Sequence, residues 1–286
     1  MQNIIKKAGV LVEAIPYIHA FRHKVFVIKY GGSILEDPVI RKNVLEDIVF
    51  LSYVGIKTIL VHGGGPHISS RLKEIGVQPV FQDGIRVTDE PTLKIVTEEL
   101  IKLNERIVKE IKELKGDVTG IIGNEDLVHV IKRQSAKDLG FVGTVTNINK
   151  DVLNTHLKRG HITVISPLGV GDSQQAYNVN ADEVASAISK AMNAEKLVLL
   201  TDVSGVMRDM NDPDSLIPTL TLEEVQNLIN TNVIKGGMIP KVNSCIEALN
   251  AGVKKVHIVD AQVEHALLLE FFTNQGIGTQ ILRDSM

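Results

Sequence analysis

The feature that most constrains this fold is a short apolar segment that recurs along the chain, each time followed by a turn and a helical pattern. The five segments are residues 25–28, 58–61, 163–166, 197–200 and 256–259. Each leads into Gly, Pro, Asp or Ser and then into residues with helical spacing. Continuous apolar runs of this length are typical of parallel strands that helices cover on both faces. The sequence therefore predicts an α/β fold with a mainly parallel central sheet.

Composition excludes several functional classes. Hydrophobic residues make up 44% of the 286 residues and charged residues 23%, as in soluble globular proteins. A net charge of −3 leaves no basic stripe, so we expect no nucleic-acid partner. No stretch approaches the roughly 18 apolar residues of a membrane span, and Glu13 interrupts the apolar run that follows Lys7. With a single cysteine, Cys245, and no zinc-type Cys/His spacing, we expect a cytoplasmic protein without a membrane partner or a metal site of its own.

Two glycine-rich loops directly follow predicted strands. "KYGGS" begins at Lys29 and leads into a helix expected near Ile34, and "HGGGP" places Gly63 to Gly65 before Pro66, which opens another helix. Bare backbone amides at a helix N-terminus, on the carboxyl edge of a parallel sheet, bind anions. One such loop could be only a tight turn, but two of them favour anion binding. An unpaired buried lysine is costly, so we expect an anion to meet Lys29.

Charged residues follow the later strands and turns. Asp202 lies in "TDVSGV", and Lys241 stands in the first turn of the helix after "KGGMIP", where a cation opposes the helix dipole. "YNVNAD" supplies Asn178 and Asp182 before an alanine-rich helix, and the alternative role of Asp182 is a helix cap. "GIRVTDEP" supplies Arg86, which makes either a two-point contact with a carboxylate or a surface ion pair.

Three other segments have a predictable local structure. Apolar residues with three and four spacing from Leu93 to Leu114 predict a packing helix that Gly116 ends. Residues 127–130 and 144–148 indicate short, half-exposed strands, forming a hairpin over one edge of the sheet. Residues 1–15 form an amphipathic helix that Pro16 closes, and this helix either folds back on the core or packs on another subunit.

The ordered set of motifs resembles the amino acid kinase family and, within it, the acetylglutamate kinases. The motifs are "VIKYGG", "LVHGGGP", "GIRVTDEP", "GFVGTV", "VISPLG", "YNVNAD", "LLTDVSGV", "GGMIPKV" and "GIGTQI". The resemblance implies an open α/β/α sandwich of two lobes: residues 23–193 for the acid, residues 194–286 for ATP, and an oligomerisation arm at residues 1–22. It also implies ATP-dependent phosphorylation of the side-chain carboxylate of N-acetyl-L-glutamate in arginine biosynthesis, with Mg²⁺ carried by the nucleotide.

By the same resemblance, Lys29 and Lys241 hold the moving phosphoryl group from its two ends, and Asp182 orients both amines. No general base is needed, because a side-chain carboxylate with a pKa of about 4.3 is already ionised at neutral pH. The implied nucleotide-binding residues are Gly31, Gly32 and Asp202, and the implied substrate-binding residues are Gly64, Gly65, Arg86 and Asn178. Arg86 would hold the α-carboxylate of acetylglutamate and Asn178 its α-amido group.

Both ends of the chain resemble the longer, arginine-inhibited form of these kinases, in which an N-terminal helix joins dimers into a hexameric ring. The candidate arginine-binding residues are Tyr17, Lys196, His265, Glu270 and Gly278. Glu270 would offer its carboxylate to the guanidinium group. The alternative is that His265 and Glu270 are solvated helix positions and that Lys196 is an ordinary charge at a strand end.

Two other functions remain open at this point. The first is another amino acid kinase, acting on carbamate, aspartate, glutamate or UMP, which would share both lysines but would not need "GIRVT" and Asn178 in this order. The second is a catalytically silent arginine sensor or scaffold with the same fold. Such a protein could lose its phosphate-facing residues, whereas this chain retains them all.

Overall fold

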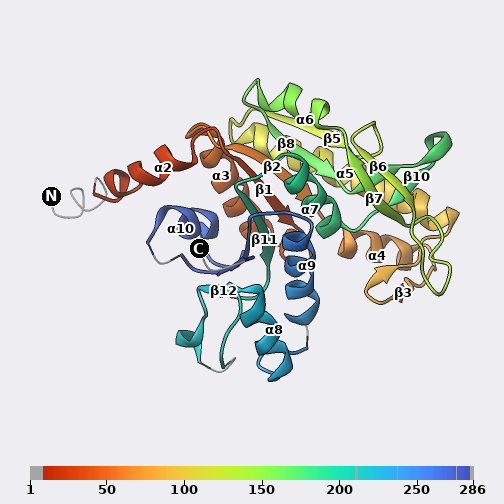
Figure 1. Ribbon diagram of the computed structural model, residues 1–286. Coiled ribbons are helices and arrows are strands. Elements are labelled where there is room, and N and C mark those ends of the chain that lie inside the picture. The colour runs from red at the N-terminus through yellow and green to blue at the C-terminus, as the bar shows by residue number, and fades with distance from the viewer. Residues whose placement is uncertain (1–8, 210–211, 237, 275, 284–286) are drawn as a thin grey trace.

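A computed structural model describes residues 9–209, 212–236, 238–274 and 276–283 of the chain, and its centre is an eight-stranded sheet (Figure 1). In spatial order the strands are β12 (Thr219–Thr221), β14 (Thr279–Leu282), β13 (Lys255–Asp260), β11 (Lys196–Thr201), β1 (Val25–Tyr30), β2 (Lys57–His62), β8 (Ile162–Ser166) and β5 (Val118–Ile122). Neighbouring strands are parallel except β13 and β14. The predicted, mainly parallel sheet is confirmed, and all five predicted strands belong to it.

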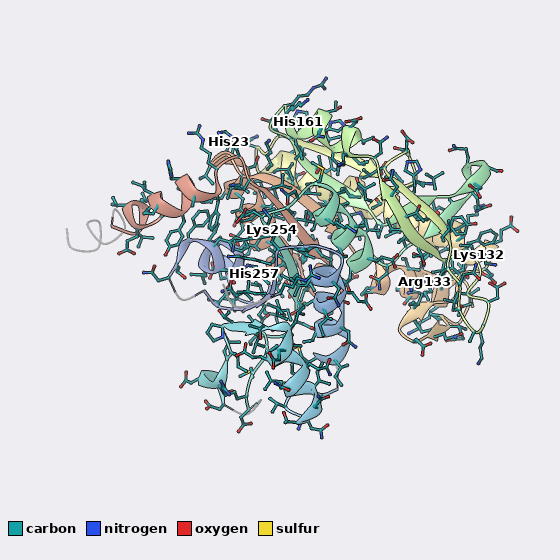
Figure 2. All side chains as sticks on the ribbon, viewed as in Figure 1. His23, Lys132, Arg133, His161, Lys254 and His257 are labelled. Carbon is teal, nitrogen blue, oxygen red and sulfur yellow. The ribbon has the colours of Figure 1, made fainter. Side chains whose placement is uncertain are left out.

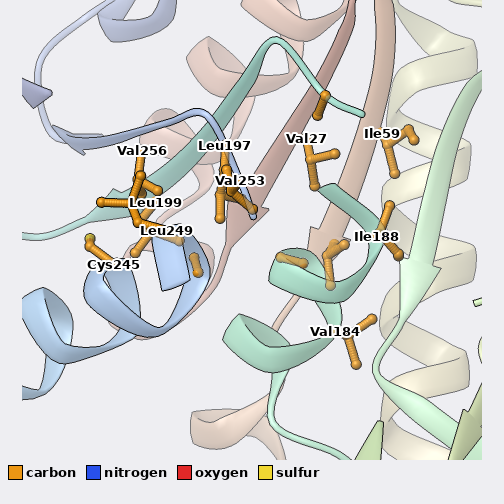
Figure 3. Packing of buried hydrophobic residues seen from close by; sticks show 14 of the residues in the cluster. Val27, Ile59, Val184, Ile188, Leu197, Leu199, Cys245, Leu249, Val253 and Val256 are labelled. Atoms are coloured by element: carbon orange, nitrogen blue, oxygen red, sulfur yellow. The ribbon is translucent and has the colours of Figure 1, made fainter. Parts of the chain in front are cut away.

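Helices cover both faces of this sheet. One face packs against α3 (Pro38–Tyr53), α5 (Glu90–Glu113) and α10 (Ala266–Phe272). The other packs against α6 (Lys150–Leu157), α7 (Ala181–Ala191), α8 (Leu222–Asn230) and α9 (Met238–Asn250). Figure 3 shows this second layer, with Val27 and Ile59 of the sheet close to Val184 and Ile188 of α7. The α/β/α sandwich is therefore confirmed.

Strand β1 shows why the sequence pattern is continuous rather than alternating. Phe26 and Ile28 point into the layer of α3, α5 and α10, whereas Val27 points into the layer of α7 and α9, and all three are fully buried. Side chains alternate between the two faces of a strand. Lys29 therefore lies on the same side of the sheet as Val27, facing α7 and α9. This alternation places its amine in the candidate site.

The predicted hairpin is confirmed, and it belongs to a second sheet that was not predicted. β6 (Val128–Lys132) and β7 (Gly143–Ile148) pair antiparallel, as expected. They belong to a separate four-stranded sheet with β9 (Leu168–Val170) and β10 (Ala176–Asn178), and Val128 and Val130 of β6 share a core cluster with Ile121 of the edge strand β5. The three-residue strands β9 and β10 are too short to show a strand period, so only two of the four strands of this sheet could be predicted.

The predicted packing helix is confirmed as α5. The Asp89 side chain caps its first turn by accepting the N–H of Thr92, at 3.0 Å. Its apolar face is buried at Leu93, Val96 and Leu100.

Across the described residues, none of the helices is long and apolar enough to cross a membrane.

The N-terminal segment contains a second helix that was not predicted. Residues 9–13 are helical, and after a turn at Ala14 the helix α2 (Ile15–Phe21) follows, with Pro16 in its first turn. The first helix therefore ends just before Pro16, as predicted, and Pro16 also fits the start of α2, because the first N–H groups of a helix have no intrahelical partner. Ile4, Ile5 and Ala8 of the predicted amphipathic face lie outside the described residues.

Candidate active site

The first glycine loop connects β1 to a single turn of 3₁₀ helix, η1 (Ser33–Leu35). Helix α3 begins only at Pro38, so the prediction of a helix starting near Ile34, directly after the glycines, was wrong. Gly32 has a φ of 84°, in the left-handed region that favours glycine. A Cβ atom on Gly31 would lie 3.1 Å from the Cα of Gly63, so the two glycine loops touch each other.

The second glycine loop connects β2 to α4 (Gly65–Glu74), with Pro66 in the first turn as predicted. The Gly63 N–H donates a hydrogen bond to the carbonyl oxygen of Tyr30 at 2.7 Å, which ties this loop to the first one. A Cβ atom on Gly64 would lie 2.6 Å from Cδ2 of Leu100 on α5. A side chain at position 64 would therefore force Leu100 of α5 to shift.

Lys29 leaves the sheet toward the first turn of α7. Its Nζ lies 3.0 Å from Oδ1 of Asp182, and the two side chains are 19% and 28% exposed. Asp182 does not cap α7, because the cap is Asn180, whose side-chain oxygen accepts the Asp182 N–H at 2.7 Å. The alternative role of Asp182 as a helix cap is therefore wrong, and its carboxylate is available to a lysine.

Lys241, in the first turn of α9, forms a second ion pair. Its Nζ donates to Oδ1 of Asp202 at 3.0 Å. This hydrogen bond holds the pKa of Asp202 below its usual range, and the charge of Lys29 also contributes to the lowering. We expected Asp182 to orient both amines; the structure pairs it with Lys29 and pairs Lys241 with Asp202.

The two lysines share one cavity of about 1090 Å³, between α7, α9 and β7. Lys29, Asp182 and Lys241 are the predicted catalytic residues, and all three line it. Gly84 and Ile85, from the small hairpin of β3 (Phe81–Gln82) and β4 (Ile85–Arg86), also line the cavity. Two cations thus face a common space large enough for a small anionic substrate and the phosphates of a nucleotide.

One wall of this cavity depends on residues that the sequence analysis missed. The Glu183 carboxylate accepts hydrogen bonds from the Arg133 guanidinium at 2.6 Å and from the Val145 N–H at 2.8 Å. These contacts tie α7 to the β6–β7 hairpin. Arg133 lies at the end of β6, next to Lys132 (Figure 2). No local pattern links residues so far apart, so only the fold reveals them.

Arg86 is buried, with 6% of its surface exposed, and is not a surface ion pair. Its Nη2 donates to the carbonyl of Gly65 at 3.1 Å and to Oγ of Ser69 at 2.7 Å, and its guanidinium stacks 4.7 Å from the ring centre of Phe81. Burial lowers the pKa of Arg86. Its Nη1 is buried and meets no hydrogen-bond acceptor among the described residues. A bound carboxylate would satisfy this donor and the buried charge.

Asn178 is joined to Arg86 through a buried threonine. Its Nδ2 donates to Oγ1 of Thr88 at 3.1 Å, and Thr88 in turn donates to the carbonyl of Arg86 at 2.9 Å. The two predicted substrate-binding residues therefore belong to one hydrogen-bonded unit. Thr88 was missed as a site residue, although it is the last letter of the "GIRVT" motif.

Lys196, Glu270 and Gly278, three of the predicted arginine-binding residues, lie in one cluster. Nζ of Lys196 is 3.1 Å from Nε2 of His257, and Nδ1 of His257 is 2.7 Å from Oε1 of Glu270. The other Glu270 oxygen accepts the N–H groups of Ile277 at 2.8 Å and Gly278 at 2.9 Å. His257 lies near the middle of the molecule in Figure 2. The prediction did not include His257.

Burial shapes the charges of this cluster. Burial lowers the pKa of Lys196 to about 8. It does so even though the rings of Phe21 and Phe271, whose centres lie 5.3 Å from the ammonium, attract a cation. Burial raises the pKa of Glu270, but the hydrogen bond and the charge interaction with His257, together with the two amide hydrogen bonds, outweigh it, and the net change is downward. Glu270 and Lys196 are therefore not the ordinary solvated charges of the alternative interpretation.

The remaining two predicted effector residues lie apart from this cluster. The Tyr17 hydroxyl, on α2, donates to Oδ1 of Asn274, just beyond α10. His265 precedes α10, and its Nδ1 lies 2.7 Å from Oδ1 of Asp47 on α3. Burial raises the pKa of Asp47 to about 6. His265 thus supports the contact between α3 and α10, and the structure does not bring it to Glu270.

Comparison with protein families and with curated proteins gives one consistent result. A model of the amino acid kinase family matches residues 24–260. An acetylglutamate kinase from Desulforamulus reducens is 45% identical over 287 residues, covering 99% of this chain and 100% of that protein. The acetylglutamate kinases of Nostoc sp. and Caldanaerobacter subterraneus are 46% and 48% identical, over 96% and 97% of this chain and 93% of each relative.

Solved structures share the fold. An N-acetylglutamate synthase from Neisseria gonorrhoeae, complexed with coenzyme A and N-acetyl-glutamate, has a TM-score of 0.84 and 28% identity. The match covers 98% of this chain but 64% of the synthase, so this chain spans less than two thirds of that protein's length. A Giardia lamblia carbamate kinase bound to AMP-PNP has a TM-score of 0.66 at 16% identity, over 92% of this chain and 99% of that one, a likeness of fold alone.

Proposed function

This chain belongs to the amino acid kinase family, and we propose that it transfers the terminal phosphoryl group of ATP to the side-chain carboxylate of N-acetyl-L-glutamate. The observation that carries the proposal is the pair of ion pairs, Lys29 with Asp182 and Lys241 with Asp202, at one cavity. The near full-length similarity to acetylglutamate kinases supports this acceptor over the other acids of the family.

The chemistry explains why two lysines are needed and a base is not. The attacking carboxylate, with an ordinary pKa of about 4.3, is already ionised at neutral pH. The difficulty is that two anions must approach each other, and negative charge then spreads over the equatorial oxygens. Two opposite unit charges that are 4 Å apart attract each other by about 4 kcal/mol at an effective dielectric constant of 20. Lys29 and Lys241 would therefore offset much of this repulsion from two sides.

On the acceptor side, Arg86 would hold the α-carboxylate of acetylglutamate and Asn178 its α-amido group. The buried Nη1 of Arg86 supports this role, because a carboxylate would supply the missing acceptor. Gly64 and Gly65 would give their N–H groups to the same substrate. The contact of Arg86 with the carbonyl of Gly65 keeps the guanidinium beside the second glycine loop.

On the nucleotide side, Gly31 and Gly32 would donate N–H groups to the phosphates, and Asp202 would hold Lys241 in place. Within the described residues, no group of three or more His, Cys, Asp or Glu side chains is placed to hold a metal ion. Mg²⁺ would then be held by phosphate oxygens, water and at most one carboxylate such as Asp202. When bound, it would neutralise part of the phosphate charge.

We further propose a division of labour along the chain, with residues 23–193 binding the acid and residues 194–286 binding ATP. Residues 1–22 would form an arm that links dimers into a hexamer, a trimer of dimers. The exposure of Val10, Leu11 and Val12, at 60%, 69% and 64%, supports a partner for this arm. A biosynthetic kinase of this kind would work in the cytoplasm.

Feedback inhibition by arginine is also part of the proposal. Glu270 would pair with the guanidinium group, and Lys196 and Gly278 would hold the other end of the ligand. The support is that Lys196, Glu270 and Gly278 meet between α2, α10 and β11, beside the proposed arm. Tyr17 and His265 would frame this site from α2 and from the start of α10.

The test of the proposed function is a panel of acceptors. ADP release from ATP is measured with acetylglutamate, carbamate, aspartate, glutamate and UMP, each with and without arginine. We expect turnover with acetylglutamate and a decrease on addition of arginine. The Lys29→Ala protein, purified in parallel, controls for contaminating kinases. Turnover with another acceptor but none with acetylglutamate would refute the proposal, and arginine binding without turnover would identify a sensor.

A further inference from the structure

We propose that His62 is a positioning residue: by holding the carbonyl of Gly63 turned toward the core, it aims the N–H of Gly64 at the acceptor substrate. This inference rests on the proposed function, in which the second glycine loop binds acetylglutamate. His62 ends β2 and has no exposed surface, and within the described residues its ring bonds to Gly63, Ser166 and Asn104 and to neither predicted lysine. Its side chain contacts the second glycine loop from the core side, at the carbonyl of Gly63.

The contacts of the imidazole fix its tautomer. Nδ1 lies 3.0 Å from the carbonyl oxygen of Gly63. Nε2 lies 3.1 Å from Oγ of Ser166 and 3.3 Å from Nδ2 of Asn104. A carbonyl oxygen can only accept, so Nδ1 carries the proton and donates it, and Nε2 accepts from the hydroxyl or the amide. Burial lowers the pKa of His62 to about 4, which keeps this neutral form at physiological pH.

The network below the loop is held in place from several sides. Asn104 also donates to the carbonyl of Val164 at 3.0 Å, so its amide cannot turn away from His62. A Cβ atom at Gly120 would lie 2.2 Å from Oδ1 of Asn104, so glycine at position 120 makes room for this side chain. The imidazole is thus fixed by buried partners on α5 and β8 before any ligand binds.

Because a peptide unit is planar, fixing the direction of the Gly63 carbonyl also fixes the direction of the Gly64 N–H. The 63–64 peptide bond is trans and therefore planar, so its C=O and N–H point in opposite directions. With the Gly63 carbonyl held toward His62, the Gly64 N–H points away from the core. Among the recorded hydrogen bonds of the described residues, none uses this N–H. Glycines on both sides would otherwise let the peptide rotate at little steric cost.

The alternative is that His62 merely fills space in the core, and amide variants separate the two roles. In His62→Asn the side-chain NH₂ can occupy the place of Nδ1 and still donate to Gly63. In His62→Gln it reaches the place of Nε2 instead, retaining more volume but losing the contact with Gly63. A filling role predicts that the smaller Asn is the worse substitution, whereas a positioning role predicts that Gln is.

The experiment measures steady-state kinetics and thermal unfolding of both variants in the full-length protein. We expect kcat/KM for acetylglutamate to fall by about 10- to 100-fold in His62→Gln, the loss of one oriented donor, and by less than about 3-fold in His62→Asn. The KM for ATP should stay within about 2-fold in both. Equal kinetics in the two variants, or losses that follow the melting temperature, would overturn the proposal.

Crystal structures of the two variants give a readout that does not depend on activity. We expect the Gly63 carbonyl to keep its direction in His62→Asn and to rotate in His62→Gln. An unchanged peptide in the Gln variant would refute the inference even if activity fell. If the Gln variant does not fold, His62→Ala replaces it, since Ala and Asn both leave a cavity and differ in the donor. A wild-type protein inactive on acetylglutamate would defeat the proposed function, while the peptide orientation would still test the geometry.

Discussion

Lys29 of β1 and Asp182 of α7 form an ion pair, with Nζ and Oδ1 3.0 Å apart, although they come from distant parts of the sequence. The pair forms because Lys29 lies on the same face of β1 as Val27, two residues before it, and this face packs against the helix layer that contains α7. A shift of one residue in β1 would turn the amine toward α3 and α5. The candidate site thus depends on the register of the central sheet.

Removing the Lys29 amine should abolish most turnover without unfolding the protein. Lys29→Ala is expected to lower kcat by on the order of 100-fold or more, the usual loss for one charge-stabilising donor. The melting temperature should change little, because the amine is at the cavity rather than in the core. Lys42→Ala, at a side chain that is 67% exposed, is the matched control and should keep full activity. An intact rate in Lys29→Ala would remove this lysine from the site.

Arg86 should control the affinity for the acceptor acid. Arg86→Lys keeps the charge but loses the forked geometry, so the KM for acetylglutamate should rise by roughly 10- to 100-fold while the KM for ATP stays nearly constant. Arg71→Lys, on the exposed face of α4, is the control. Equal increases in both KM values would point to a general disturbance of the fold and against this role.

The glycines of the second loop should differ in their effect on stability. Gly64→Ala is expected to lower the free energy of unfolding by about 1–3 kcal/mol, because its Cβ would lie 2.6 Å from Leu100. Gly65→Ala meets no atom within 4 Å and should be nearly neutral in denaturant unfolding, whatever it does to activity. Equal destabilisation of the two variants would contradict the close packing of the loop on α5.

Lys196 should make stability depend on pH in the alkaline range. Its pKa is about 8 in the folded protein against 10.5 ordinarily, so between these values the unfolded chain binds more protons and stability rises with pH. Below pH 8 both states are charged and the cost of burying the charge is constant. Relative to Lys196→Met, the wild type should therefore gain on the order of 2 kcal/mol between pH 8 and 10.5. If the difference in the free energy of unfolding between the wild type and Lys196→Met is the same at pH 8 and pH 10.5, the pKa of Lys196 is not lowered by burial.

Glu270 should be required for inhibition by arginine. Glu270→Gln removes the carboxylate that would pair with the guanidinium, so arginine at a concentration that inhibits the wild type should have little effect. Glu264→Gln is the control, since that side chain is 79% exposed and precedes α10. Inhibition curves of the two variants and the wild type provide the measurement, and undiminished inhibition of Glu270→Gln would place the arginine site elsewhere.

Sequence reasoning found the parts of the site that lie in strand–loop–helix units. Lys29 lies near the carboxyl end of β1, and Asp182 and Lys241 lie in the first turns of α7 and α9, so their place at one edge of the sheet could be predicted from topology. The partner of Lys241 could not, because a side-chain ion pair depends on distances that only the packed lobes define. His62, Arg133 and Glu183 were missed for the same reason.

The short elements of the fold were missed for a different reason. β9, β10 and β12 have three residues each, too few for a strand period to appear. Pro16 was interpreted only as the end of one helix, although proline also fits the start of the next, where it stands in α2. In both cases the local sequence allows two structures, and tertiary packing selects one.

The central claim is that Lys29 and Lys241 surround the transferred phosphoryl group, and a crystal structure with acetylglutamate and a non-hydrolysable ATP analogue tests it most directly. The account predicts that both Nζ atoms lie within hydrogen-bond distance of oxygens on the terminal phosphate, with the acceptor carboxylate on its opposite side. If both analogue and acid are bound and either amine points away from that phosphate, the account is contradicted.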